Sequence, residues 1–83
     1  MEIFENKVAV ITGAASGIGQ ALAQKCLEEG MKVMLADVES EALAATQASF
    51  QERFNNPIES EVVDVSIVTE IERLRDATLS KFD

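Results

Sequence analysis

Histidine and tyrosine are absent from this 83-residue sequence, and cysteine occurs only once. Without histidine the chain lacks the commonest metal ligand and the usual general base near neutral pH. With Cys26 as its one thiol, it can form no internal disulfide and cannot assemble a zinc site from histidine and cysteine. We therefore predict no metal site and interpret Cys26 as a core residue.

Long apolar runs and positive charge are also scarce. No stretch approaches the roughly 18 apolar residues of a membrane span, and the N-terminus MEIFENK does not resemble a signal peptide. Fifteen acidic residues against seven basic ones give a formal charge of -8, which opposes binding to nucleic acid or to an anionic membrane. We therefore expect a cytoplasmic protein in which local groups hold any phosphate ligand.

Three short segments have the composition of β-strands. Residues 7–12 (KVAVIT) and 32–37 (KVMLAD) form continuous apolar runs, which are typical of strands buried on both faces. Residues 58–65 (IESEVVDV) begin with acidic side chains and end with valines. We expect this third strand to have an exposed start, a buried end and a place at the edge of the sheet.

Helices are predicted after each of these strands. In residues 17–29, Ile18, Leu22 and Cys26 recur at helical spacing on one face, and Gly30 follows as a residue that can adopt positive φ. A helix over residues 40–54 is expected to be capped by Ser40 and ended by the Asn-Asn-Pro that follows it. A third helix opens at Ser66. The expected core-facing residues of the last two helices are Leu43, Gln47, Phe50 and Phe54, and then Ile67, Ile71, Leu74 and Phe82.

The predicted order of elements is β-α-β-α-β-α, which belongs to the α/β class. Right-handed crossovers between parallel strands then give half of a Rossmann-like, doubly wound sheet with strand order 3-2-1. This order leaves the apolar strand 7–12 at an open edge, although such strands normally have neighbours on both sides. We therefore expect residues 1–83 to be the N-terminal dinucleotide-binding segment of a longer protein.

The segment ITGAASGIG, which starts at residue 11, places three glycines where the first strand becomes the first helix. The first amides of a helix lack partners within it and carry the positive end of its dipole, so they can bind an anion. We expect Gly13 to allow the turn, Gly17 to let a pyrophosphate reach the backbone, and Gly19 to let the helix pack closely. Ser16 can cap the helix, and Thr12 can hold the turn through its hydroxyl.

Two aspartates end strands at the same edge of the predicted sheet. Asp37 lies about twenty residues after Gly17, where a dinucleotide-binding fold places the carboxylate that binds the adenosine ribose. Its charge would repel a 2′-phosphate, and the nearby sequence offers no cation, so NAD is favoured over NADP. Asp64 could accept a hydrogen bond from the adenine amino group while Val65 packs near the base. Structural roles at a strand end or a helix start remain the alternative for both aspartates.

These residues resemble the cofactor site of the short-chain dehydrogenase/reductase family. The resemblance rests on Gly-x-x-x-Gly-x-Gly at 13–19, on Asp37 in LAD and on Asp64-Val65 in VVDV, and it runs through essentially the whole chain. It implies that Ile18 adds a backbone amide to the pyrophosphate and that Thr12 holds the loop. It also implies an NAD(P)-dependent oxidoreductase that interconverts an alcohol and a carbonyl, usually as a dimer or tetramer.

The catalytic signature of that family is not found in this sequence. Its members carry an Asn-Ala-Gly turn, a serine, and a tyrosine followed four residues later by a lysine, whereas this chain has no tyrosine. We assign no catalytic residue, and we expect these 83 residues to be inactive alone. The determinants of substrate and stereochemistry would lie beyond Asp83.

Two other interpretations stay open at this point. The chain could be a non-catalytic NAD-binding module, or it could use its open strand edge to bind a partner by β-augmentation. Rossmann-like methyltransferases also combine a glycine loop with an acid after the second strand, but the Thr-Gly-x-x-x-Gly-Ile-Gly form argues against them.

Overall fold

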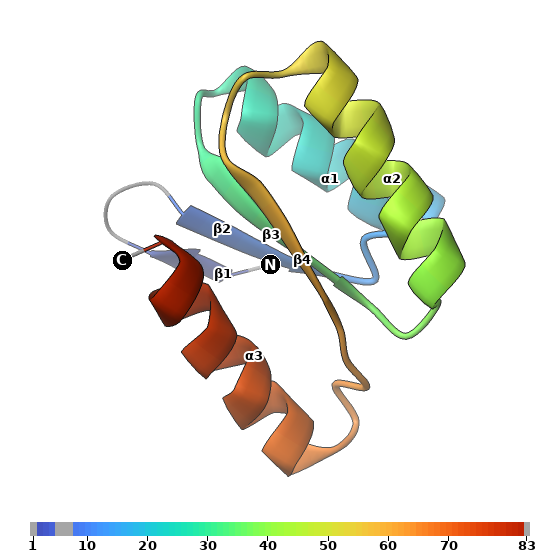
Figure 1. Ribbon diagram of the computed structural model, residues 1–83, viewed down its shortest axis with the longest axis vertical. Helices are drawn as coiled ribbons and strands as arrows, with labels where there is room; N and C mark the ends of the chain where they lie inside the picture. The colour runs from blue at the N-terminus through green and yellow to red at the C-terminus, as the bar shows by residue number, and fades with distance from the viewer. Residues whose placement is uncertain (1, 5–7, 83) are drawn as a thin grey trace.

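The computed structural model describes residues 2–4 and 8–82. A sheet carries two helices on one face and a third helix on the other (Figure 1). Within the described residues, no helix is both long and apolar enough to cross a membrane. The elements in chain order are β1 (Glu2–Phe4), β2 (Val8–Thr12), α1 (Gly17–Glu28), β3 (Lys32–Asp37), α2 (Ser40–Arg53), β4 (Ile58–Val62) and α3 (Val68–Phe82).

The strand order confirms the predicted α/β fold, with one addition. Strands β2, β3 and β4 are parallel neighbours in the predicted 3-2-1 order. The short β1 pairs antiparallel with β2, so the prediction that the first apolar strand is an open edge is wrong. A three-residue strand has no periodicity that a sequence pattern could reveal. Residue 7, the expected start of the strand 7–12, lies outside the described residues.

Strands β2 and β3 are buried on both faces, as their continuous apolar runs predict. Ile11 and Leu35 pack under α1 and α2, whereas Val10 and Met34 face α3. The four central residues of β3 are fully buried. The sheet therefore fixes the ends of β2 and β3 rigidly, and the loops that follow them start from defined positions.

Helix α1 buries a narrower stripe than its apolar residues suggest. Ala23, Cys26 and Leu27 face the core, which confirms the interpretation of Cys26. Ile18 is 80% exposed and Leu22 is 40% exposed, so the expectation that they share a buried face with Cys26 is wrong. The apolar side chains are spread around more of α1 than β2 and β3 cover, and those at its start and on its flank stay in solvent.

The end of α1 is confirmed. Gly30 adopts φ +83°, and its amide donates to the Leu27 carbonyl while the Met31 amide donates to the Cys26 carbonyl. This pair of hydrogen bonds is the Schellman arrangement that a glycine after the helix favours.

Helices α2 and α3 depart from prediction at particular residues. Ser40 is the first helical residue of α2, and Glu39 holds the cap position without a side-chain hydrogen bond, so the expected Ser40 cap is wrong. The α2 face with Leu43 and Phe50 is buried as expected. The third helix begins at Val68 instead of Ser66; Leu74 is buried on it, but the predicted core residues Ile71 and Ile67, the latter just before α3, are almost half exposed. The predicted strand 58–65 is also corrected: β4 ends at Val62, its start is buried at Ile58 and its end is exposed at Val62, and only Val63 of the valines at 62, 63 and 65 is buried.

Candidate functional site

The carboxyl ends of the three parallel strands bring the predicted site residues to one edge of the sheet. Thr12 at the end of β2 pairs with Ala36, and Asp37 at the end of β3 pairs with Val62 near the end of β4. The glycine loop, Asp37 and the segment after β4 therefore follow three neighbouring strands on the same side of the sheet. This edge is where open α/β sheets bind ligands.

Ser16 organises the glycine loop between β2 and α1. Gly13 adopts φ +65°, a conformation that glycine takes without strain. The Ser16 amide and hydroxyl both donate to the Gly13 carbonyl, at 3.0 and 2.7 Å, and the Ser16 hydroxyl accepts from the Gly19 amide at 3.2 Å. Ser16 is thus the N-cap of α1, as predicted. The Thr12 side chain is exposed and makes no hydrogen bond to the other described residues, so the expectation that its hydroxyl holds the turn is wrong.

Gly17 and Gly19 lie two positions apart in surroundings that differ sharply. A Cβ at Gly19 would lie 2.7 Å from the Gly13 carbonyl carbon and 2.9 Å from Ala14 Cα, so the close approach of α1 to its own loop requires this glycine. A Cβ at Gly17 would meet nothing within 4 Å. No contact within the described chain explains the missing side chain at 17, which leaves the first amides of α1 open to a ligand.

Asp37 ties the glycine loop to the end of β3. Its carboxylate accepts from the Ala15 amide at 2.9 Å and from the Glu39 amide at 3.1 Å. Partial burial alone would raise the pKa of Asp37, but hydrogen bonds from the backbone of Glu39, Ala15 and Val38 outweigh it and lower the pKa. Asp37 is therefore ionised at neutral pH, and each oxygen keeps room for a further donor because a carboxylate has about four acceptor positions.

Asp64 begins the turn that leads into α3. One of its carboxylate oxygens accepts from both the hydroxyl and the amide of Ser66, at 2.6 and 3.0 Å, and these bonds lower the pKa of Asp64. Val65, the next residue, is 43% exposed. The structure thus gives Asp64 the helix-start role that was the structural alternative, and leaves its second oxygen available.

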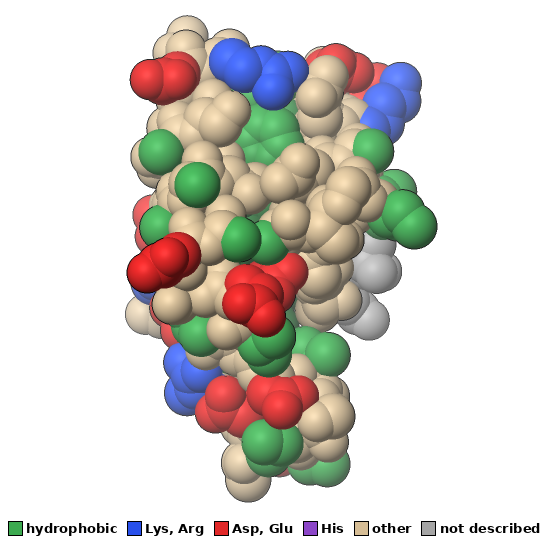
Figure 2. Space-filling model, turned by 90° about the vertical axis from the view of Figure 1, so that its right-hand side faces the viewer, with side chains coloured by type: hydrophobic (Ala, Val, Ile, Leu, Met, Phe, Trp, Pro, Cys, Tyr) green, Lys and Arg blue, Asp and Glu red, His purple; other side chains and the backbone are tan. Residues whose placement is uncertain are grey.

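A groove of about 530 Å³ runs between α1 and α2, away from both aspartates. It extends from Gly17 to Arg53 and is lined mainly by small and polar side chains. In Figure 2 hydrophobic atoms floor a hollow whose upper rim is basic, in agreement with Arg53 lying 5.6 Å above the Phe50 ring. Gln20 of α1 donates to Thr46 of α2. Part of the polar lining of the groove is therefore already hydrogen-bonded within the protein.

Sequence reasoning missed the polar residues that hold the site in place. The Ala15 and Glu39 amides that fix Asp37 are backbone groups, which a residue of almost any type can supply, so a sequence motif cannot reveal them. Arg73 of α3 contacts the last residue of β4, and Glu70 contacts the segment after it. Their spacing of three residues on a helix is a signal of an ion pair, but not of where that pair points.

A model of the short chain dehydrogenase family matches residues 7–83. The chain belongs to this family. It is 36% identical over 80 residues to 3beta-hydroxysteroid dehydrogenase 2 of Eggerthella lenta, covering 96% of this chain and 30% of that protein. Curated relatives of this kind are about three times as long as this chain.

Solved structures of the family superpose closely on this fold. A short chain dehydrogenase/reductase from Burkholderia phymatum in complex with NAD is 43% identical, with a TM-score of 0.88, over 99% of this chain and 29% of that one. L-sorbose reductase from Gluconobacter frateurii, complexed with NADPH and L-sorbose, is 33% identical, with a TM-score of 0.87, over 92% of this chain and 29% of that one. The fold and the family are therefore both confirmed.

Proposed function

We propose that residues 1–83 form the dinucleotide-binding N-terminal part of an oxidoreductase that transfers hydride between a nicotinamide cofactor and an alcohol or carbonyl substrate. The observation that carries this proposal is the 2.9 Å hydrogen bond from the Ala15 amide to Asp37. It fixes a carboxylate suited to ribose hydroxyls at a constant distance from the open amides of α1. Phosphate and ribose groups of one ligand can then be bound together.

The glycine loop would bind the pyrophosphate. The amides of Gly17 and Ile18 lie at the positive end of the α1 dipole and have no partner within the helix. Gly17 presents no Cβ, and Ile18 is 80% exposed, so a ligand can approach both backbone groups. Gly13 and Gly19 give this loop its shape, and Thr12 ends the strand from which the loop starts.

Asp37 would select NAD over NADP. An ionised carboxylate accepts hydrogen bonds from the ribose 2′- and 3′-hydroxyls and repels a 2′-phosphate. No ion pair among the described residues includes Asp37, so its charge is not neutralised by a neighbouring cation. Asp64 and Val65 would border the adenine, with the second carboxylate oxygen of Asp64 accepting from the amino group. L-sorbose reductase of Gluconobacter frateurii, to which this chain is similar in structure, is complexed with NADPH, so the same fold also binds a dinucleotide with a 2′-phosphate.

The chemistry of the whole enzyme needs groups beyond this chain. Bound nicotinamide supplies the hydride acceptor or donor, and a separate acid or base must exchange the proton of the substrate oxygen. No residue of this chain is assigned that role, and homo-oligomers and a small-molecule substrate belong to the longer enzyme in this proposal. The alternative of β-augmentation at β2 loses its basis, because β1 occupies that edge.

Titration of the protein with NAD and NADP by calorimetry tests this proposal. We expect NAD to bind more tightly than NADP, and Gly17→Val to abolish binding of both because the side chain blocks the backbone. The matched control is Ala48→Val, which adds the same β-branched side chain to an exposed position of α2 outside the groove. No binding of either dinucleotide would refute the proposal, and tighter binding of NADP would refute the role of Asp37.

A further inference from the structure

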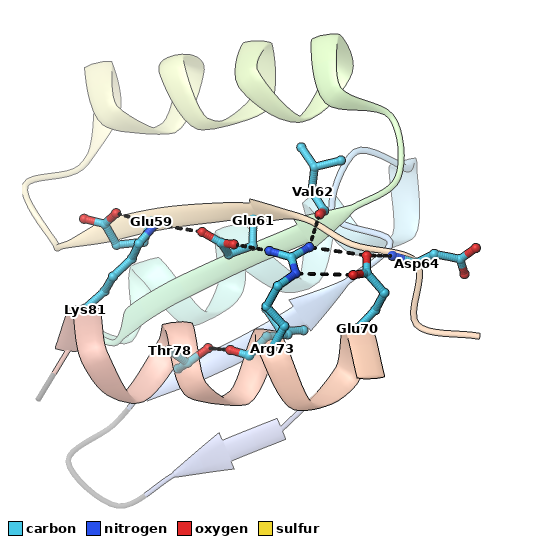
Figure 3. A network of polar contacts seen from close by, with 9 residues as sticks. Glu59, Glu61, Val62, Asp64, Glu70, Arg73, Thr78 and Lys81 are labelled. Carbon is cyan, nitrogen blue, oxygen red and sulfur yellow. Dashed lines mark hydrogen bonds and ion pairs between the residues drawn. The ribbon is translucent and has the colours of Figure 1, made fainter. Parts of the chain in front are cut away.

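Two basic side chains of α3 contact β4. Lys81 contacts Glu59 at 3.6 Å and Glu61 at 2.9 Å, both on β4. Arg73 contacts Glu61 at 2.8 Å and donates to the Val62 carbonyl at 2.7 Å. Figure 3 shows these contacts as one row that joins the helix to the strand. Glu59 and Glu61 pair with Met34 and Ala36, which face α3, so these contacts lie on the α3 face of the sheet at its last strand.

Arg73 also connects this row to the segment after β4. Its Nε donates to one Glu70 oxygen at 3.3 Å, and the other Glu70 oxygen accepts from the Asp64 amide at 3.4 Å. The peptide group between Val62 and Val63 is held from both sides. Its carbonyl accepts from Arg73, and its amide donates to the Asp37 carbonyl at 3.0 Å.

The charges around Arg73 make it the group on which this arrangement depends. Its guanidinium uses all three nitrogens, on Glu61, on Glu70 and on the Val62 carbonyl. Without it, the Val62 carbonyl would lose its donor from α3, Glu61 would keep only its contact with Lys81, and Glu70 would keep only the Asp64 amide among the described residues. Because Glu70 reaches the Asp64 amide while the Asp64 carboxylate points away from Arg73, the network holds the backbone and leaves that carboxylate available (Figure 3).

We propose that Arg73, acting through Glu70, is a positioning residue for the adenosine end of the bound dinucleotide. It contacts no ligand. It fixes Val62–Asp64 and so sets where Asp64 and Val65 lie relative to Asp37. This inference rests on the proposed function, because it assumes that the adenosine moiety lies between the two aspartates.

The test compares Arg73→Met with Arg75→Met in the whole chain. Both variants remove one guanidinium from α3, but among the described residues Arg75 pairs with the adjacent Asp76 alone and makes no polar contact with β4. Calorimetric titrations use NAD, AMP and inorganic pyrophosphate, which probe the whole site, the adenosine side and the glycine loop. We expect Arg73→Met to weaken NAD and AMP binding about fivefold and to leave pyrophosphate binding and the Arg75→Met affinities unchanged.

Two further variants separate positioning from general stability. Arg73→Lys keeps the charge and one donor group, so we expect AMP affinity between those of wild type and Arg73→Met. Glu70→Gln should weaken AMP binding without adding its full effect to that of Arg73→Met, since both act through one contact. Unchanged AMP affinity in Arg73→Met, or equal losses of AMP and pyrophosphate binding, would overturn the inference. A wild-type chain that binds neither NAD nor AMP would instead overturn the proposed function.

Discussion

Alanine substitutions at Gly17 and Gly19 should have opposite effects on stability, although the two residues are separated by one position in the same helical turn. At Gly19 the new Cβ would lie 2.7 Å from the Gly13 carbonyl carbon and 2.9 Å from Ala14 Cα, and both neighbours are backbone atoms. Backbone cannot rotate away as a side chain can. Overpacking of this kind costs about 1–3 kcal/mol, so Gly19→Ala should lower the free energy of unfolding by that amount.

Gly17→Ala meets none of this resistance. Nothing lies within 4 Å of the new Cβ, and the helical backbone at 17 suits alanine. Replacing glycine by alanine in a helix is favourable by up to about 1 kcal/mol, so the variant should be as stable as wild type or more stable. Its dinucleotide affinity should nevertheless fall, because the methyl group occupies the path of a phosphate to the first amides of α1.

Urea unfolding and NAD titration of both variants check this reasoning. The expected result is that Gly19→Ala lowers the free energy of unfolding, whereas Gly17→Ala lowers only the affinity for NAD. A Gly19→Ala protein as stable as wild type would show that the loop can move away from α1. A Gly17→Ala protein that binds NAD with unchanged affinity would show that the ligand does not approach this glycine.

Three further predictions concern the Ser16 cap, the selectivity at Asp37 and the pH dependence of stability. Ser16→Ala should lower the free energy of unfolding by about 1 kcal/mol, measured in urea, because the Gly19 amide loses its capping oxygen; unchanged stability would show that water replaces the cap. Asp37→Ala should weaken NAD more than NADP in calorimetric titrations, and equal losses would contradict the ribose assignment. Acidification should destabilise the fold. The pKa values of Asp37 and Asp64 are lowered in the folded state, so their contribution is complete above the unfolded value of about 3.9 and is lost as pH falls through the lowered pKa. In a double variant with Asp37→Ala and Asp64→Ala, the free energy of unfolding should fall less than in wild type between about pH 5 and about pH 3.

The parts of the fold that could be predicted are those with a strong local pattern. The β3 bounds follow from a continuous apolar run between Gly30 and the polar segment after Asp37, and the N-cap role of Ser16 follows from a serine before a glycine-started helix. Both signals depend on neighbouring residues in the chain. Both predictions agree with the structure because packing in the sheet favours the same local conformations.

The failures have a common physical cause. Apolar side chains at Ile18 and Ile71 predict burial only if something covers that part of the helix, and the described chain covers less of α1 and α3 than their apolar residues could occupy. The antiparallel pairing of β1 and the contact of Arg73 with the Val62 carbonyl depend on tertiary placement rather than on local pattern. The positions and hydrogen bonds of Asp37 and Asp64 are defined by the structure, and their ligand roles stay predictions.

Asp37 has two tasks in this arrangement, and they constrain how cofactor preference can change. Its carboxylate anchors the glycine loop through the Ala15 amide, and in the proposed function it also accepts the ribose hydroxyls. Replacing it with a small neutral residue to admit a 2′-phosphate would therefore release the loop as well as remove the repulsion. A change of preference toward NADP then needs a second substitution that supplies a new acceptor to Ala15 or a cation to the phosphate. Under the proposed function, cofactor selectivity and loop order would both depend on the Asp37 side chain.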